Sequence, residues 1–138
     1  MPDPDKTLTF LLMDPPFESA RTATAFRLLD VAARRGLHVN VFAYEGAVAL
    51  PFAAQKQHAN SVHNRTIEEE QHPLPKDWVA AVMRTANAAG GQVEWVNCGL
   101  CVDERGVADA VAGVRRGSPA DFWKMSSSSR NTLVIASR

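Results

Sequence analysis

Residues 7–44 read TLTFLLMDPPFESARTATAFRLLDVAARRGLHVNVFAY, and this stretch decides the fold. Its first part, Thr7–Met13, is short, mostly apolar and compatible with a β-strand, and the prolines at 15 and 16 prevent the strand from continuing. His38–Tyr44 resumes strand character after an intervening helical pattern. A strand, a helix and a strand within about 40 residues form a βαβ unit, which predicts parallel strands joined by a right-handed crossover.

The helix between these strands is predicted from its spacing. Its apolar residues repeat at i, i+3, i+4 and i+7, the spacing of one helix face, which holds Ala25, Leu28, Leu29 and Ala32. Gly36 follows two arginines, and such a glycine is a typical C-terminal stop because it tolerates the left-handed conformation.

The middle of the chain alternates between patterned and unpatterned segments. Residues 45–52 are apolar and predict a short helix, whereas residues 54–76 show no pattern and predict a long loop. A second long helix is expected after Asp77 as its N-cap and before Gly90. A third strand is expected over residues 92–97, with Cys98 where it ends.

The last third predicts a short helical turn and a short strand within residues 107–116. Ser118, Pro119 and Asp121 then provide an N-cap, a proline at the first helical position and an acid at the third, which favours a helix start. We expect this helix to bury Phe122, Trp123 and Met125, and residues 132–136 to form a buried strand. All three tryptophans are expected in the core, namely Trp78, Trp95 and Trp123.

Alternating strands and helices in one unit of this length predict an α/β protein, a three-layer α/β/α sandwich with a mainly parallel sheet of about five strands. We expect a single domain over residues 1–138, with flexible residues 1–6.

The composition of the chain excludes several classes of function. The chain has 138 residues and as many basic as acidic residues, 15 of each, so its net charge is zero and nucleic-acid binding is not expected. No apolar run approaches the roughly 18–20 residues that span a bilayer, and the acidic, proline-containing start is unlike a signal peptide. With two cysteines and no export signal, the cytoplasm is the expected location, where a close cysteine pair favours chemistry over a structural disulfide.

The densest group of chemically active residues is CGLCVDERG, residues 98–106. It directly follows a predicted strand and reads as a short helix that ends at Gly106. A cysteine at a helix N-terminus faces backbone N–H groups that stabilise its thiolate, so we expect Cys98 to be the more reactive thiol and to be reachable from solvent. Cys101 lies one turn deeper, and Arg105 is expected to pair with Asp103, Glu104 or an incoming anion.

Other chemistries lack the residues they need. A zinc site would require two further ligands near the cysteines, and only scattered residues such as His58, His63 and His72 are available, so no metal site is expected. No phosphate-binding GxxxxGK[ST] or GxGxxG motif is present, so no nucleotide cofactor is expected. A packing role remains an alternative for the two cysteines, since buried cysteine behaves as a small hydrophobe.

The motif C-G-x-C-x-D-x-R-G resembles the DsrE/DsrF-like proteins of sulfur-transfer chemistry, in which many members carry this signature after the third main strand. Here it is carried by Cys98, Gly99, Cys101, Asp103, Arg105 and Gly106, and the resemblance extends over nearly the whole chain. It implies a parallel five-stranded α/β/α fold and homo- or hetero-oligomers, commonly dimers, trimers or hexamers. For the sulfur-relay members it also implies that the cysteine matching Cys98 accepts sulfane sulfur as a persulfide.

Three functional hypotheses follow. The first is a sulfur carrier or sulfurtransferase-like protein that exchanges sulfur with donor and acceptor proteins. Cys98 would hold the persulfide, the backbone N–H groups of residues 99–101 (Gly99, Leu100 and Cys101) would stabilise it together with Asp103, and Cys101 would resolve it, protect it or simply pack. The second is a thiol redox protein that uses the Cys98/Cys101 pair, and the third is a non-catalytic oligomeric subunit.

Overall fold

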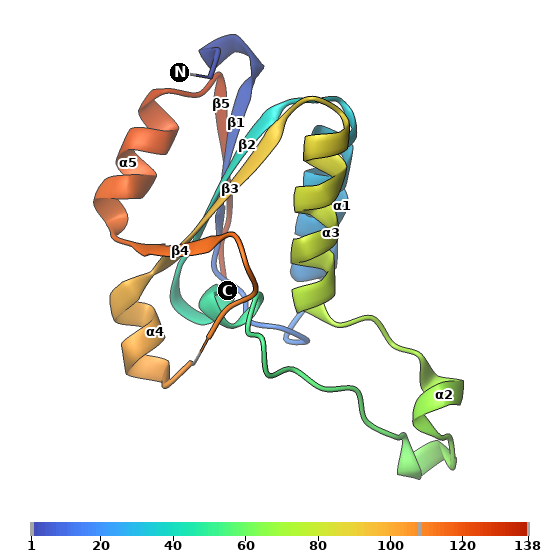
Figure 1. Ribbon diagram of the computed structural model, residues 1–138. Coiled ribbons are helices and arrows are strands. Elements are labelled where there is room, and N and C mark those ends of the chain that lie inside the picture. Colours follow the sequence, from blue (N-terminus) through green and yellow to red (C-terminus); the bar gives the residue numbers. More distant parts are fainter. Residues whose placement is uncertain (1, 108, 138) are drawn as a thin grey trace.

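The structure, a computed structural model, describes residues 2–107 and 109–137. Its centre is one sheet of five parallel strands in the order β4-β3-β2-β1-β5 (Figure 1). The strands are β1 (Thr7–Leu12), β2 (His38–Ala43), β3 (Gln92–Cys98), β4 (Val114–Gly117) and β5 (Asn131–Ile135). All carboxyl ends therefore lie at one edge, where open parallel sheets place their sites.

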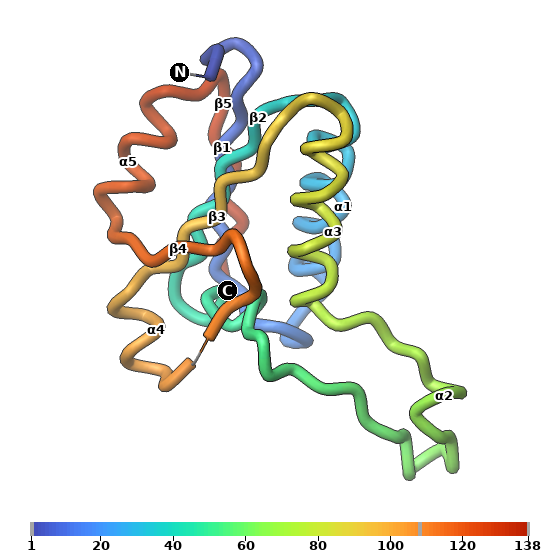
Figure 2. The backbone as a smooth tube through the Cα atoms, in the orientation of Figure 1, coloured from blue at the N-terminus to red at the C-terminus, as the bar shows by residue number. Residues whose placement is uncertain are grey.

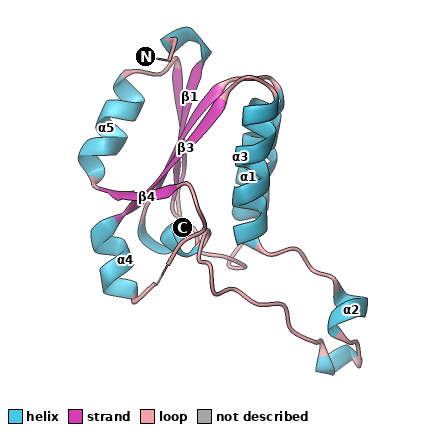
Figure 3. Cartoon of the chain, in the orientation of Figure 1, coloured by secondary structure: helices cyan, strands magenta, loops and turns pink. Residues whose placement is uncertain are grey.

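Helices cover both faces of the sheet, which confirms the three-layer sandwich. The helices α1 (Ala20–Arg34) and α3 (Pro75–Ala88) lie side by side on one face, and α4 (Gly99–Arg105) and α5 (Pro119–Ser127) lie on the other (Figure 3). Four shorter helical segments complete the described part of the chain, namely η1 (Pro4–Lys6), η2 (Glu45–Ala49), η3 (Ser61–His63) and α2 (Ile67–Glu70). No helix in the described part of the chain has the length and apolar character needed to cross a bilayer.

The core is packed against the inner strands. Trp95 of β3 is fully buried and its ring stacks on Phe26 of α1. Its indole Nε1–H donates to the Asn97 side-chain oxygen at 3.1 Å, and the Asn97 amide donates to the Val48 carbonyl at 3.1 Å. Buried polar groups need hydrogen-bond partners, and here they find them in each other. The resulting chain of hydrogen bonds attaches η2 to the carboxyl end of β3.

Several local predictions are confirmed. Gly36 has φ +70° after the last residues of α1, and Gly106 has φ +61° at the end of α4. Ser118 and Asp121 form a capping box at the start of α5, with Pro119 at its first position. The expected flexibility of residues 1–6 is not among the confirmed predictions: residues 4–6 form a 3₁₀ turn capped by Asp3.

Other local predictions are wrong. The second long helix begins at Pro75 rather than after Asp77, since a proline with a preset φ and no N–H suits the first helical position. The segment 54–76 contains two short helical segments, because its capping residues satisfy the backbone locally. Within residues 107–116, the short strand that was expected is present as β4, but the expected helical turn is only a single hydrogen-bonded turn, in which the Val114 N–H donates to the Val111 carbonyl at 3.4 Å. Ala108 lies outside the described residues.

Burial was overestimated in the outer parts of the fold. Trp123 is 75% exposed and Trp78 is 36% exposed, so of the three tryptophans only Trp95 is fully enclosed. Leu28 on α1 is partly exposed as well. The final strand is not buried, because β5 lies at the edge of the sheet and Val134 faces solvent.

Candidate thiol site

Cys98 lies where β3 becomes α4, with no intervening loop. It is both the last residue of the strand and the N-cap of the helix, which starts at Gly99. The adjacent strand β4 pairs Asn97 with Arg116 and Cys98 with Gly117. The predicted position of the cysteine motif, a strand end followed by a short helix, is therefore what the structure contains.

The two thiols are buried, which contradicts the expectation that Cys98 is reachable. Cys98 is 2% exposed and Cys101 is 5% exposed, and both belong to the hydrophobic core together with Ala47 and Val48 of η2. The Cys98 side chain also makes no capping hydrogen bond with the amides at the start of α4, so the expected stabilisation of its sulfur by these amides is not present. The reason lies in the tertiary structure, because α4 packs on η2 and the two elements together cover the thiols. We call this region, where β3, α4 and η2 meet, the thiol corner.

The cysteines form a pair, and both are free thiols. Burial raises the pKa of Cys101 and its hydrogen bond with the Cys98 thiol raises that pKa further, whereas the Glu45 amide and the nearby Arg105 charge oppose these effects. The Glu45 N–H donates to the Cys101 sulfur at 3.2 Å. Glu45 has φ +51°, an unusual value for a residue with a side chain, and this turn directs its amide at the sulfur.

A guanidinium group that the sequence analysis did not identify lies beside the pair. Arg116 at the end of β4 donates to both carboxylate oxygens of Asp103 at 3.0 Å and to the Gly99 carbonyl at 3.2 Å. This pairing lowers the pKa of Asp103, and the pKa of Arg116 is raised chiefly by Asp103 and to a smaller extent by the charge of Cys98. A Cβ atom on Gly99 would lie 2.9 Å from the guanidinium, so the absence of a side chain at this position leaves room for Arg116.

The predicted site residues are thus only partly brought together. Cys98, Gly99, Cys101 and Asp103 meet at the corner, with Asp103 held by Arg116. Arg105 approaches Glu104, one of its expected partners, at 3.8 Å and the Cys101 carbonyl at 3.5 Å, both from the far end of α4. The Leu100 side chain is 71% exposed, so this residue brings only its backbone near the thiols. A pair of arginines before a glycine, residues 115–117, is the sequence signal that could have indicated Arg116.

An open hollow of about 470 Å³ adjoins this corner between the end of β3, α4 and β4. Its lining includes Asn97, Val102, Asp103, Val107, Val114 and Arg116. Within the described residues, no three or more histidine, cysteine or acidic side chains gather in a way that could hold a metal ion. His58 and His72 have ring centroids 4.8 Å apart, and both belong to the segment between η2 and α3.

Together, the fold and this corner define a class: three-layer α/β proteins with a parallel five-stranded sheet and a cysteine pair where the third strand meets a short helix. The model of the DsrE/DsrF-like family matches residues 6–135. The chain therefore belongs to the DsrE/DsrF-like family.

The fold is shared with a solved structure. The crystal structure of the YchN protein from E. coli superposes with a TM-score of 0.72 over 93% of this chain and 97% of that chain, at 17% sequence identity. At that identity the similarity concerns the fold alone. A search of curated proteins found no matching sequence.

Proposed function

We propose that this protein is a cytoplasmic sulfur carrier, sulfurtransferase-like in its chemistry, that holds sulfur as a persulfide on Cys98. The observation that supports this most is the position of two free thiols, one at the end of β3 and one a helical turn further on, with the Arg116 guanidinium bonded to the Gly99 carbonyl next to Cys98. Membership of a family generally linked to sulfur relay supports the same chemistry.

Loading would proceed by transfer of one sulfur atom between thiolates. The Cys98 thiolate attacks the outer sulfur of a donor persulfide, R–S–SH, forming Cys98–S–SH and releasing the donor as R–S⁻. Because the thiolate is the nucleophile, a positive charge near Cys98 favours the reaction. Arg116 supplies that charge, while its hydrogen bonds to Asp103 and Gly99 keep the guanidinium at the corner.

Unloading has two routes. An acceptor thiolate attacks the outer sulfur of Cys98–S–SH, takes it as a new persulfide and leaves the Cys98 thiolate. Alternatively, the Cys101 thiolate attacks the inner sulfur, forming a Cys98–Cys101 disulfide and releasing hydrosulfide. Burial and the Cys98 hydrogen bond raise the pKa of Cys101, which favours its neutral thiol form. Since only the thiolate attacks a persulfide, transfer to an acceptor thiolate is favoured over release by Cys101.

Burial sets a condition on this proposal. With Cys98 only 2% exposed, a donor protein reaches the sulfur after α4 moves away from η2. That helix has seven residues. Among the described residues, its polar attachments to other elements are the Glu45–Cys101 hydrogen bond and the contacts of Arg116. A short element with few attachments opens locally at less cost than the core strands.

A thiol redox function is the second candidate, and it is favoured by two buried, free thiols one helical turn apart. In this case an oxidant would remove two electrons and two protons from the pair and leave a Cys98–Cys101 disulfide. No sulfur would be gained, so the mass of the product separates the two candidates.

Intact-mass spectrometry after incubation with a low-molecular-weight persulfide, glutathione persulfide, tests the proposal. We expect the wild type and Cys101→Ser to gain one sulfur atom and Cys98→Ser to gain none. Loss of two hydrogen atoms in the wild type alone would establish the redox function instead. An unchanged mass in every variant, under conditions in which denatured protein reacts, would leave the cysteines as core residues of a non-catalytic subunit.

A further inference from the structure

The segment between η2 and α3 forms an arm, residues 54–74, that extends away from the sandwich (Figure 2). Its base is attached to the body: Gln55 donates to the carbonyls of Ala49 and Leu50, and the His72 ring meets the edge of Phe17. Its tip, residues 61–70, comprises η3 and α2 and lies away from the two long helices in Figure 1. The tip therefore cannot bury its side chains against its own sandwich.

The tip is nonetheless built by its own hydrogen bonds. Asn60 and Arg65 exchange two backbone hydrogen bonds of 2.9 Å, and Thr66 and Glu69 form a capping box at the start of α2. Arg65 also pairs with Glu70 at 3.3 Å. Ordering a segment costs about 1–2 kcal/mol per residue, which local polar contacts offset poorly without apolar burial.

The apolar side chains of the tip face solvent instead. Val62 is 87% exposed and Ile67 is 43% exposed. Among the described residues, Glu68 beside them has no ion-pair partner. The tip as a whole carries three glutamates and a single arginine, so it is an acidic surface with two apolar side chains.

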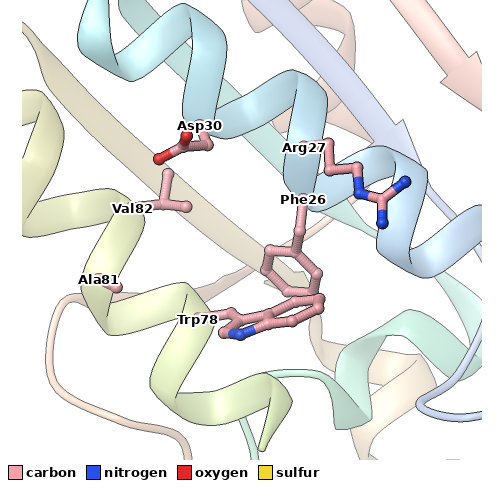
Figure 4. A pocket seen from close by; sticks show the side chains of 6 residues that line it. All are labelled: Phe26, Arg27, Asp30, Trp78, Ala81 and Val82. Atoms are coloured by element: carbon pink, nitrogen blue, oxygen red, sulfur yellow. The ribbon is translucent and has the colours of Figure 1, made fainter. Parts of the chain in front are cut away.

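A mostly apolar surface lies on the sandwich, between α1 and α3, and its two charged residues are Arg27 and Asp30. This α1–α3 groove has a volume of about 290 Å³ and is lined by Phe26, Arg27, Asp30, Trp78, Ala81 and Val82 (Figure 4). Its floor is aromatic, because the Phe26 and Trp78 rings meet edge to face at a centroid distance of 5.2 Å. A second hollow of about 170 Å³ shares Trp78 and continues to Phe17 and His72 at the base of the arm.

The groove offers the tip an apolar contact and one arginine without an ion-pair partner among the described residues, since Asp30 at the groove is already paired with Arg34. A branched side chain such as that of Ile67 is small enough for a groove of this volume, and the aromatic floor gives it an apolar contact. Helix α1 carries Arg21, Arg27 and Arg34 against one aspartate, and Arg27 at the groove has no ion-pair partner among the described residues. Glu68 follows Ile67 directly, so a docked tip would bring an unpaired carboxylate toward an unpaired guanidinium.

We propose that the α1–α3 groove binds the arm tip of a second copy of this chain. Each copy carries both surfaces, so two copies can exchange tips reciprocally, and such an exchange closes with twofold symmetry. Val62 and Ile67 are the apolar anchors of this contact, and the Glu68–Arg27 pair fixes its orientation. The contact is independent of the thiol chemistry, because it lies on the face of the sheet opposite to α4.

Sedimentation velocity over a range of protein concentrations tests the proposal. We expect the wild type to form dimers or larger assemblies, and Val62→Asp combined with Ile67→Asp to weaken association by about tenfold or more, as loss of central apolar anchors does. Trp123→Asp is the matched control, because that side chain is also large, apolar and 75% exposed but lies on α5. It is expected to leave the assembly unchanged.

Charge reversal and cross-linking locate the contact. Arg27→Glu is expected to weaken association and Glu68→Arg in the same chain to restore it. In a background with Cys98→Ser and Cys101→Ser, mixing an Ile67→Cys chain with an Ala81→Cys chain is expected to give a mixed disulfide between copies. A wild type that stays monomeric at all concentrations would overturn the proposal, as would an assembly that is indifferent to the tip and groove variants.

Discussion

The Arg116 guanidinium donates to both carboxylate oxygens of Asp103, so the end of β4 is tied to the helix that covers the two thiols. The same guanidinium also bonds the Gly99 carbonyl, next to Cys98. The Arg116 side chain therefore affects both the access to the Cys98 sulfur and the positive charge near it. Substitutions at Asp103 and Arg116 can separate these two effects.

Removing the carboxylate while keeping the guanidinium should make Cys98 more accessible. In a Cys101→Ser background, we expect Asp103→Asn to raise the rate of Cys98 alkylation by iodoacetamide by about threefold, since a solvent-exposed ion pair contributes modestly to holding α4. Peptide mass spectrometry measures the rate. Arg115→Gln is the control, because Arg115 pairs with Glu94 and Asp121 rather than with α4. Equal rates in all three proteins would show that the Arg116–Asp103 pair does not hold the corner closed.

The raised pKa of Cys101 makes stability depend on alkaline pH. Burial and the Cys98 hydrogen bond favour the neutral thiol in the folded state, so the folded protein binds this proton more tightly than the unfolded chain. The stabilisation is fully present below the unfolded pKa and is lost as pH rises through the folded pKa. In reducing buffer, urea unfolding should therefore show a steeper loss of stability above about pH 9 for the wild type than for Cys101→Ala. Parallel curves for the two proteins would contradict the assignment.

The Asn97 side chain links β3 to η2 beneath the site, and its removal should destabilise the protein markedly. Asn97→Ala leaves the Trp95 indole N–H and the Val48 carbonyl without their partners in a buried place. We expect the free energy of unfolding to fall by about 2–4 kcal/mol, the usual range for two buried groups left unsatisfied. Denaturant unfolding measures it. Asn87→Ala on the exposed side of α3 should change stability by less than about 0.5 kcal/mol.

Gly117, which pairs with Cys98 across the sheet, should not tolerate a larger residue. A Cβ atom there would overlap the Asp121 carboxylate and the buried Val96 side chain. We expect Gly117→Ala to destabilise the protein by about 1–3 kcal/mol through overpacking. Gly90→Ala is the comparison, because Gly90 has φ +85° but no neighbouring atom within 4 Å, so its cost is backbone strain alone. A smaller effect at Gly117 than at Gly90 would contradict this reading of the β4–α5 junction.

Much of the fold could be predicted from local patterns. The periodicity of α1, the capping box of Ser118 and the glycine at 106 each depend on residues a few positions apart, and each was confirmed. The start of α3 was misplaced because Asp77 is a good capping residue, yet Pro75 two residues earlier is a better first helical residue.

The candidate site was predictable only in part. The motif placed Cys98 at a strand-to-helix junction, and the junction is there. Its burial was missed because the residues that cover it belong to η2, about fifty positions earlier, and to β4. Arg116 was missed for the same reason: its contact with Asp103 exists only because β4 pairs with β3.

The sequence by itself determined which segments become strands and helices, where most of them end, and which two thiols lie one helical turn apart. These features depend on side-chain spacing and on backbone preferences within a few residues. Only the tertiary structure decided that the thiols are enclosed, that a guanidinium from the adjacent strand joins them, and that Trp123 and the arm tip remain exposed. The burial of a side chain and the charges around it depend on residues that are distant in the chain. The local spacing of residues in the sequence therefore does not predict them.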